Sequence, residues 1–280
     1  MIIDAHAHVW RRWPYDPVPD EVGRGSFNEL VSYLDANHVD KAVLVSANIE
    51  GNHDNNHYGA EAVARHPDRF IQIADIDSRW SAEYHIRGAS DRLHRLVDAF
   101  NPIGVSHYLA PDNDGWLTSE EGLAFFKSVS AHRLLVGLAA PPPWFADVRA
   151  LARTFPETTF LVNHLGLVTL YSGGEKAALS MVIDHEDLPN LLVKVSGYYY
   201  AHRSPRGGYP FTGRMDIVRA FYENWGPRRM IWASDFPSLL EYMSYGESLD
   251  VLREHAPFIG PKDLVGILGG TLEDVLARRM

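Results

Sequence analysis

Two histidines stand two positions apart near the start of the chain, as His6 and His8. In an extended strand, residues two apart point to the same side, so both imidazoles would face one space. Imidazole nitrogens that converge from one side can bind a single divalent ion or a single carbonyl oxygen. The spacing therefore predicts metal or acid–base chemistry at the end of the first strand.

Two further polar residues end later strands of the predicted fold. His164 closes an apolar run just before a glycine, and Asp235 follows the last such run of the chain. An aspartate beside imidazoles can make a bound water basic and a bound carbonyl electrophilic. We expect His6, His8, His164 and Asp235 to converge and to carry the catalysis.

The elements that must position these residues are short β-rich runs separated by helical stretches. The strands are predicted to begin near Ile2, Ala42, Phe70, Ile103, Leu134, Thr159, Leu191 and Met230. Two of the intervening helices begin with predicted capping boxes, at residues 26–29 and 118–121. Strands that alternate with helices pair in parallel, because each return crossover needs a helix.

Two parallel architectures are compatible with this order, a doubly wound open sheet and a closed (β/α)8 barrel. A nucleotide-binding open sheet has a glycine-rich turn after its first strand, whereas residues 9–14 read Val-Trp-Arg-Arg-Trp-Pro. Eight βα units and a typical length of about 250 residues favour the barrel. We predict a single-domain (β/α)8 TIM barrel over residues 1–280, with Asp235 beside His6 and His8 because strands one and eight are neighbours.

Strict alternation also assigns the faces of the first strand. It places Asp4 with His6 and His8 toward the barrel interior. It gives the helix layer the apolar set Ile3, Ala5, Ala7 and Val9. On the seventh strand, Lys194 is expected to face inward and to pair with a carboxylate.

Composition restricts the class of protein. The chain has 280 residues, of which 46% are hydrophobic and 22% charged, as in ordinary globular proteins. The 26 basic and 36 acidic residues give a net charge of −10, which disfavours nucleic acid and acidic lipid surfaces as partners. Cysteine is absent, and neither a signal peptide nor a membrane segment is recognised. We expect a cytoplasmic protein that acts on a small molecule.

A set of short motifs runs along the whole chain. In chain order they are residues 4–8 (DAHAH), Asn56, residues 66–70 (HPDRF), 163–166 (NHLG), 193–197 (VKVSG), 233–237 (ASDFP) and 268–271 (LGGT). By these motifs the chain resembles the amidohydrolase superfamily, in particular its amidohydrolase-2 branch. Within that branch, the chain length and the Lys-x-Ser-Gly element resemble the sugar-lactone and pyrone-dicarboxylate lactonases.

The resemblance implies roles for the four polar residues. Asp235 would accept a proton from the attacking water, and His164 would polarise the carbonyl or assist the leaving oxygen. His6 and His8 would bind the carbonyl or, with Asp235 and optionally His164, one zinc or manganese ion. Metal-binding relatives place a histidine on the fifth strand, which here reads LLVGLAAP over residues 134–141. A metal-independent enzyme therefore remains an alternative.

These observations favour a hydrolase that opens a cyclic ester, a lactone. The alternative enzyme is a metal-dependent decarboxylase of the aminocarboxymuconate-semialdehyde decarboxylase type, which would use the same four residues. A barrel that only binds a small ligand is a third hypothesis, although a mere binder has little use for a general base. The sequence does not fix the oligomeric state, and a homo-oligomer is compatible with it.

Further residues at the predicted strand ends are candidates for binding the substrate. Relatives carry an arginine at the position of Ser106, so a dicarboxylate substrate is not expected. Arg203 and Arg206 follow the seventh strand, where they could bind one carboxylate or simply form a solvated pair. The aromatic residues favour a ring-shaped lactone that is neutral or singly charged. The full predicted set is Ser106, Tyr108, Trp144, Tyr198, Arg203 and Arg206.

Overall fold

The computed structural model describes residues 1–15, 23–183, 187–200 and 208–278. Its eight strands form one sheet in the order β1 to β8, and each strand is parallel to the next. The strands are β1 (Ile3–Ala7), β2 (Lys41–Val45), β3 (Phe70–Asp75), β4 (Gly104–Tyr108), β5 (Leu135–Ala139), β6 (Phe160–Val162), β7 (Leu191–Val195) and β8 (Met230–Trp232). Every strand begins within one residue of its predicted start.

The sheet closes on itself just beyond β8. Ala7 and Phe236 form a parallel bridge, the amide of His8 donates to the Phe236 carbonyl at 2.6 Å, and the amide of Asp235 donates to the His6 carbonyl at 2.8 Å. An open doubly wound sheet would have neither this closure nor a strictly sequential strand order. The (β/α)8 barrel is confirmed.

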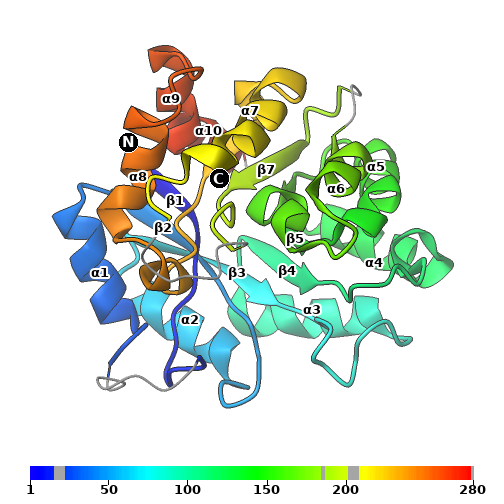
Figure 1. The fold of residues 1–280 in the computed structure, drawn as a ribbon. Helices are drawn as coiled ribbons and strands as arrows, with labels where there is room; N and C mark the ends of the chain where they lie inside the picture. Colours follow the sequence, from blue (N-terminus) through cyan, green and yellow to red (C-terminus); the bar gives the residue numbers. More distant parts are fainter. Residues whose placement is uncertain (16–22, 184–186, 201–207, 279–280) are drawn as a thin grey trace.

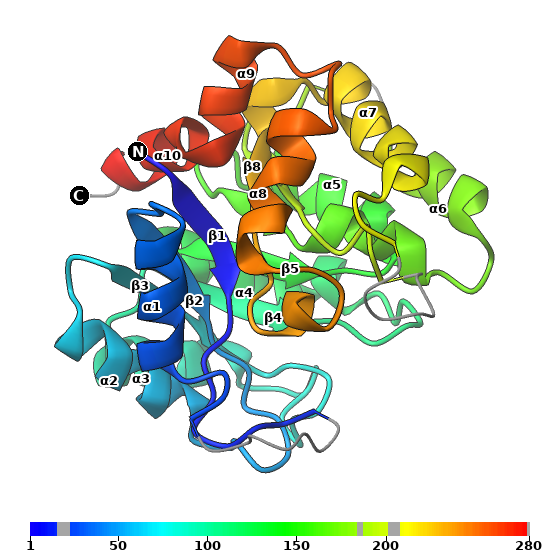
Figure 2. The same cartoon turned by 60° about the vertical axis from the view of Figure 1, so that its left-hand side comes forward.

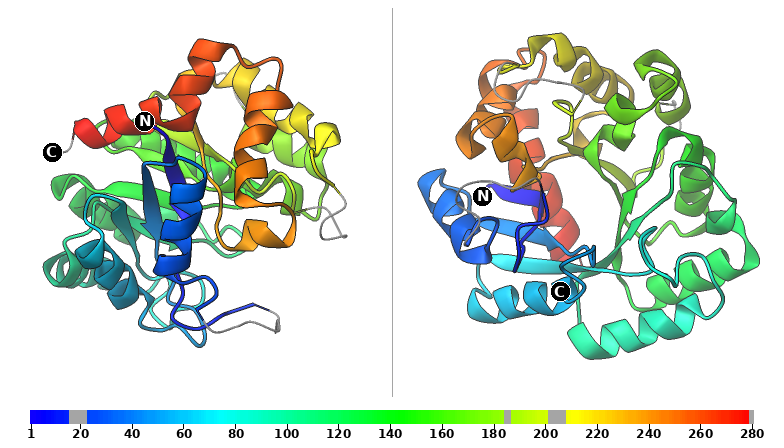
Figure 3. Two further views of the ribbon diagram at one scale, coloured as in Figure 1. Left: turned by 90° about the vertical axis from the view of Figure 1, so that its left-hand side faces the viewer. Right: turned by 60° about the horizontal axis from the view of Figure 1, so that its bottom comes forward.

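Helices surround the strands on the outside, as the right panel of Figure 3 shows. They are α1 (Phe27–Ala36), α2 (Asn55–Arg65), α3 (Ala89–Phe100), α4 (Glu120–Ala131), α5 (Phe145–Thr154), α6 (Glu175–Val182), α7 (Met215–Asn224), α8 (Tyr245–Glu254), α9 (Pro261–Val265) and α10 (Thr271–Ala277), labelled in Figure 1. Short 3₁₀ segments join several of them to the strands. Within the described part of the chain, no helix has the length and apolar content needed to cross a bilayer.

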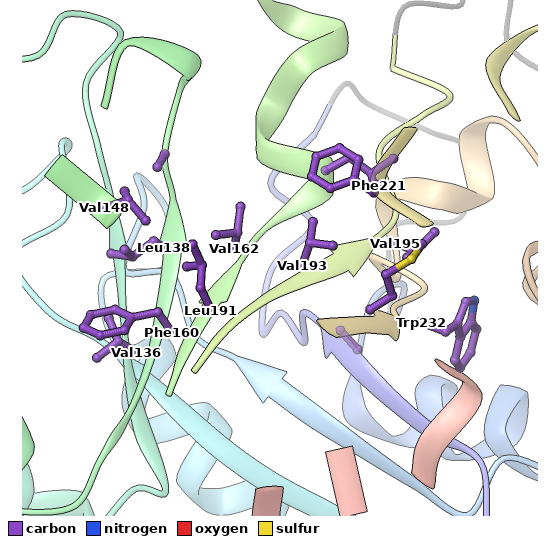
Figure 4. Packing of buried hydrophobic residues seen from close by; sticks show 14 of the residues in the cluster. Val136, Leu138, Val148, Phe160, Val162, Leu191, Val193, Val195, Phe221 and Trp232 are labelled. Atoms are coloured by element: carbon purple, nitrogen blue, oxygen red, sulfur yellow. The ribbon is translucent and has the colours of Figure 1, made fainter. Parts of the chain in front are cut away.

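Two apolar cores stabilise the barrel. The outer core lies between strands and helices; in Figure 4, Val136 and Leu138 of β5 lie near Val148 of α5. The inner core fills the barrel with residues such as Val43, Leu161 and Ile231. Leu272 and Leu276 of α10 complete it at the end where the strands begin, next to β1 in Figure 2. The opposite end, where the strands finish, is left for polar residues.

The strict alternation predicted for β1 is wrong in its first half. Ile3 and Ala5 belong to the inner core, and the register against β2 shifts between Asp4 and Ala7. Asp4 instead accepts hydrogen bonds from the Ser234 amide (2.9 Å), the Ser234 hydroxyl (2.5 Å) and the hydroxyl of Tyr245 on α8 (2.7 Å). This register shift is a β-bulge, and it lets Asp4 connect β1 to the residues after β8 by hydrogen bonds. His6 and His8 still face the interior.

The predicted helix caps are confirmed in part. The Ser26 hydroxyl accepts from the Glu29 amide at 3.2 Å, but the Glu29 carboxylate bonds to Gly25, one residue before the cap. The second cap is Ser119 and not Thr118. Glu121, the predicted partner of Thr118, instead accepts hydrogen bonds from the backbone amides of residues 88 and 89 at the start of α3. This carboxylate therefore ties α4 to the neighbouring helix.

Candidate active site

A cavity of about 860 Å³ opens at the end of the barrel where the strands finish. Side chains from the loops after most of the strands line it, and aromatic and proline residues dominate the wall. The polar and aromatic residues of the lining are His8, Tyr15, Arg79, Trp80, Tyr108, Asp112, His164, Tyr171, Ser172, Tyr200, Asp235, Ser238 and Tyr242. This is the end at which barrel enzymes carry their catalytic residues.

The four predicted catalytic residues converge at the base of this cavity. Asp235 Oδ1 lies 3.8 Å from His6 Nε2, 3.8 Å from His8 Nε2 and 3.7 Å from His164 Nε2. All four side chains are at least nine-tenths buried. One carboxylate oxygen therefore faces three imidazole nitrogens, at distances that suit groups around one small reactant.

The second oxygen of Asp235 is held by hydroxyl groups. Asp235 Oδ2 accepts hydrogen bonds from Tyr200 and Ser238, and from Tyr199 at 3.3 Å. These donors leave Oδ1 free to take a proton from a bound molecule. Burial raises the pKa of Asp235 above the ordinary carboxyl value, while His8 and the hydroxyl donors oppose that rise.

The three histidines are neutral at pH 7. Burial lowers the pKa of His8 to about 4 and that of His164 to about 3, and it holds the pKa of His6 well below its usual value. Each Nδ1 has a partner: the Val45 carbonyl for His8 (2.7 Å), the Ser196 hydroxyl for His164 (2.9 Å) and Lys194 Nζ for His6 (3.0 Å). The rings are thereby fixed with Nε2 toward Asp235.

Lys194 faces inward as predicted, but its hydrogen-bond partner is His6 and not a carboxylate. When Lys194 is charged it donates to His6 Nδ1, His6 Nε2 donates to His8 Nε2 at 3.0 Å, and His8 Nδ1 donates to the Val45 carbonyl. When Lys194 is neutral it can accept from His6 Nδ1, which frees the His6 Nε2 lone pair. Burial lowers the pKa of Lys194 to about 7, although Asp4 and Asp235 oppose this shift, so both states are accessible.

The residues fit a single divalent ion. His6, His164 and Asp235 offer ligand atoms within 4.8 Å of one another, and His8 Nε2 adjoins His6. Tetrahedral ligands around zinc, with bonds of about 2.1 Å, lie roughly 3.4 Å apart, close to the spacings found here. Neutral imidazoles and one carboxylate are suitable donors. The structure brings His164 into this group, whereas the core ligand set predicted from the sequence was His6, His8 and Asp235.

The segment after β6 presents His164 through an unusual backbone. His164, Leu165, Gly166 and Leu167 all have φ between 51° and 66°, in the left-handed region. Asp235 also has a positive φ, of 63°. Non-glycine residues adopt this conformation at a cost in free energy, and such strain concentrates at functional sites. The surrounding structure therefore holds the backbones of His164 and Asp235 in this conformation.

The predicted substrate-binding residues differ in where they lie. Tyr108 lines the cavity, and Ser106 lies below it on the same face of β4. Both hydroxyl groups are buried, and the Ser106 hydroxyl opposes the rise in the pKa of Tyr108 that burial causes. Arg203 and Arg206 lie outside the described residues.

The placement of Trp144 and Tyr198 does not support the predicted role. Trp144 is fully buried behind the cavity wall, where its indole donates to the Ala110 carbonyl at 2.8 Å. Tyr198 points into the apolar layer and packs on Tyr199 and Phe211, with ring centroids 5.2 and 5.9 Å away. The prediction depended on the position of both residues just after a strand. That position does not determine the direction in which a loop side chain points.

Several residues of the site escaped the sequence analysis. Tyr200 and Ser238 hold Asp235, whereas Tyr15, Arg79 and Trp80 line the cavity. Ser238 had a usable signal, because it stands three residues after Asp235 at the same strand end. No pattern in the sequence marks the others, since their contribution depends on the paths of long loops.

We expect Tyr200→Phe to lower kcat/KM by about tenfold, the effect of losing one hydrogen bond to a charged group. Because Tyr200 lowers the pKa of Asp235, its removal should raise that pKa further. Because the predicted base Asp235 acts in its ionised form, the acid limb of the pH–rate profile should then move to higher pH. Tyr222→Phe, which removes a hydroxyl bonded to Asp263 far from the site, is the control. An unshifted acid limb in the Tyr200 variant would contradict the assignment.

Comparisons with known proteins agree with this fold. The model of the amidohydrolase family matches residues 3–276, so the chain belongs to the amidohydrolase family. A curated relative, L-fucono-1,5-lactonase from Burkholderia ambifaria, is 27% identical over 166 residues, which cover 56% of this chain and 55% of that protein. The matched part thus spans about half the length of the curated relative.

Solved structures share the fold over essentially the whole chain. A probable 2-pyrone-4,6-dicarboxylic acid hydrolase from Acinetobacter baumannii with citric acid bound has a TM-score of 0.77 and 22% identity, covering 99% of both chains. A zinc-bound amidohydrolase from Burkholderia multivorans has a TM-score of 0.73 and 17% identity, again covering 99% of both. A 2,6-dihydroxybenzoate decarboxylase from Rhizobium has a TM-score of 0.65 and 15% identity, covering 100% of this chain and 98% of that one.

Proposed function

We propose that this protein is a hydrolase that opens a lactone with a water activated by Asp235. The observation that carries the proposal is the position of Asp235 Oδ1, which faces the Nε2 atoms of three neutral histidines at 3.7–3.8 Å in the cavity. The family and the partial similarity to a curated lactonase support the same reaction class.

The geometry suggests how the reaction proceeds. Asp235 Oδ1 accepts a proton as the water oxygen bonds to the ester carbonyl carbon. His164 donates a hydrogen bond from Nε2 to the carbonyl oxygen, because its Nδ1 can accept from the Ser196 hydroxyl. The ring C–O bond then breaks, and the proton on Asp235 passes to the leaving alkoxide. The product is the open-chain hydroxy acid, and Asp235 is again ionised.

A single divalent ion is part of the proposal, with zinc or manganese as the candidates. His6, His8 and Asp235 would hold it, with His164 as an optional ligand, and it would polarise the carbonyl and acidify a bound water. A metal-independent reaction on the same residues is the alternative. The charged form of Lys194 suits that alternative, because it leaves a proton on His6 Nε2.

We expect no more than one equivalent of metal per chain, and we expect prolonged chelation to remove it. The described ligands are imidazoles and one carboxylate, and β5 contributes only apolar residues and glycine. Elemental analysis before and after dialysis against a chelator measures the content. Two equivalents that resist chelation would contradict a mononuclear site and indicate a binuclear hydrolase.

The proposed substrate is a small ring-shaped ester. Tyr15, Trp80 and Tyr108 provide aromatic faces for stacking. A panel of sugar and aromatic lactones tests the proposal in a weakly buffered assay that records acid release. Acid release that requires Asp235 supports lactone hydrolysis. Carbon dioxide release from aromatic acids would support the decarboxylase, and binding without turnover would support a ligand-binding barrel.

A further inference from the structure

The segment between β3 and α3 carries an arginine to the cavity that holds Asp235. Arg79 lines this cavity, together with Trp80, Tyr108 and the catalytic residues. We propose that Arg79 recognises a carboxylate of the substrate, so that the preferred lactone is a ring bearing one negative charge. This inference rests on the proposed function and adds the charge class of the substrate.

The backbone of Arg79 is fixed to the barrel. Its amide donates to the carbonyl of Tyr108, the last residue of β4, at 2.9 Å. The next residue, Trp80, is anchored by a hydrogen bond of 3.1 Å from its indole nitrogen to the buried carboxylate of Asp75. A guanidinium on a fixed base loses less conformational entropy when it binds an anion than one on a free loop.

The side chains form a continuous wall. The Arg79 guanidinium carbon lies 6.0 Å from the centre of the Trp80 ring, and the centres of the Trp80 and Tyr108 rings are 4.7 Å apart. A planar ring that stacks on this wall would present its carboxylate to Arg79 and its ester to the catalytic residues.

The charges around Arg79 also favour this role. In the described part of the chain, Arg79 makes no ion pair with a carboxylate, whereas Arg92 of the following helix pairs with Asp77 and Glu83. The cavity wall contains the acidic residues Asp112 and Asp235, and the whole chain carries a net charge of −10. An anionic substrate would be repelled unless a cation met it. Arg79 is the only basic side chain among the described residues of the lining other than the neutral histidines.

Neighbouring cations do not take over this role. Lys194 is fully buried and bonded to His6 below the cavity. Ser106 of β4 is fully buried and offers only a hydroxyl. Arg79 can therefore bind one carboxylate of the substrate. The described lining of the cavity offers no second cationic side chain that could bind the other carboxylate of a dianion.

The first experiment measures binding and does not need turnover. Titration calorimetry compares cyclopentanecarboxylate with the uncharged cyclopentanecarboxamide on the wild type and on Arg79→Met, Arg79→Lys and the control Arg87→Met. Arg87 is an exposed arginine in the same loop that does not line the cavity. We expect Arg79→Met to weaken carboxylate binding by about 10- to 100-fold and to leave carboxamide binding unchanged. Arg79→Lys should recover part of the loss.

The second experiment measures hydrolysis of γ-butyrolactone-γ-carboxylate and its carboxamide. Arg79→Met should raise KM for the anionic lactone by a similar factor, with kcat changed less than threefold. The proposal is overturned if the wild type does not prefer the carboxylate probe, or if that preference survives Arg79→Met. A loss of the preference in Arg203→Ala or Arg206→Ala would then assign the anion site to those residues. If neither lactone is hydrolysed but the Arg79-dependent binding holds, the proposed reaction fails and the anion site stands.

Discussion

Asp235→Asn should lower kcat/KM for the best lactone by at least about a hundredfold, the usual contribution of a general base. The amide keeps the shape of the side chain, but its oxygen and nitrogen cannot take a proton from water. Asp235 is the only carboxylate whose oxygen lies within 4 Å of all three histidines among the described ion pairs. Steady-state kinetics on the purified variant measures the effect.

The fold of the variant must be verified separately, because Asp235 is fully buried and accepts three hydroxyl hydrogen bonds. Circular dichroism and the thermal midpoint show whether the barrel is intact. Asp98→Asn, at an exposed position near the end of α3, is the matched control and should keep wild-type activity. A folded Asp235→Asn enzyme with unchanged turnover would exclude Asp235 from the mechanism.

The fold and the convergence of His6, His8, His164 and Asp235 were predictable because both depend on periodic patterns. Eight alternating βα units define the barrel, and polar residues at strand ends must meet at one rim. The interior direction of Asp235 follows from alternation with Ile231 and Ala233, which lie in the inner core. For these residues, local sequence and global topology give the same answer.

The predicted alternation of side chains along β1 is wrong because the strand contains a bulge, and no sequence pattern marks that bulge. Asp4 was expected inside the barrel, whereas it lies at the seam with the residues after β8. His6 and His8 face the interior because the register shifts within β1, and a strict alternation of side chains along the strand does not include this shift.

Loop residues were the least predictable part of the site. Tyr200 lines the cavity and Tyr198 does not, although they are only two residues apart. The chain after β7 has no periodic backbone from which the sequence could assign their faces. Arg79 and Trp80 reach the cavity only through the hydrogen bonds of residues 75, 79 and 80 with their neighbours. Such contacts depend on tertiary structure and leave no spacing in the sequence.

His164→Ala should reduce kcat by about a hundredfold, comparable to the loss of an oxyanion-stabilising donor. Its Nε2 lies 3.7 Å from Asp235 Oδ1, and its ring lies at the cavity surface, whereas His6 lies deeper and is fully buried. Because His6, His8 and Asp235 remain as ligands, metal content should fall less than activity. Parallel measurement of kcat and of bound metal, by elemental analysis, compares the two effects.

Ser196→Ala provides the control, since it removes the hydroxyl at 2.9 Å from His164 Nδ1 and leaves the imidazole in place. It should lower kcat by about tenfold, because an imidazole without this partner keeps its chemistry but loses its fixed tautomer. If His164→Ala instead loses all bound metal, and added metal does not restore activity, His164 is a ligand and its role as a donor to the substrate is wrong. Full activity in His164→Ala would show that His164 takes no part in the reaction, which would then depend on Asp235, His6 and His8.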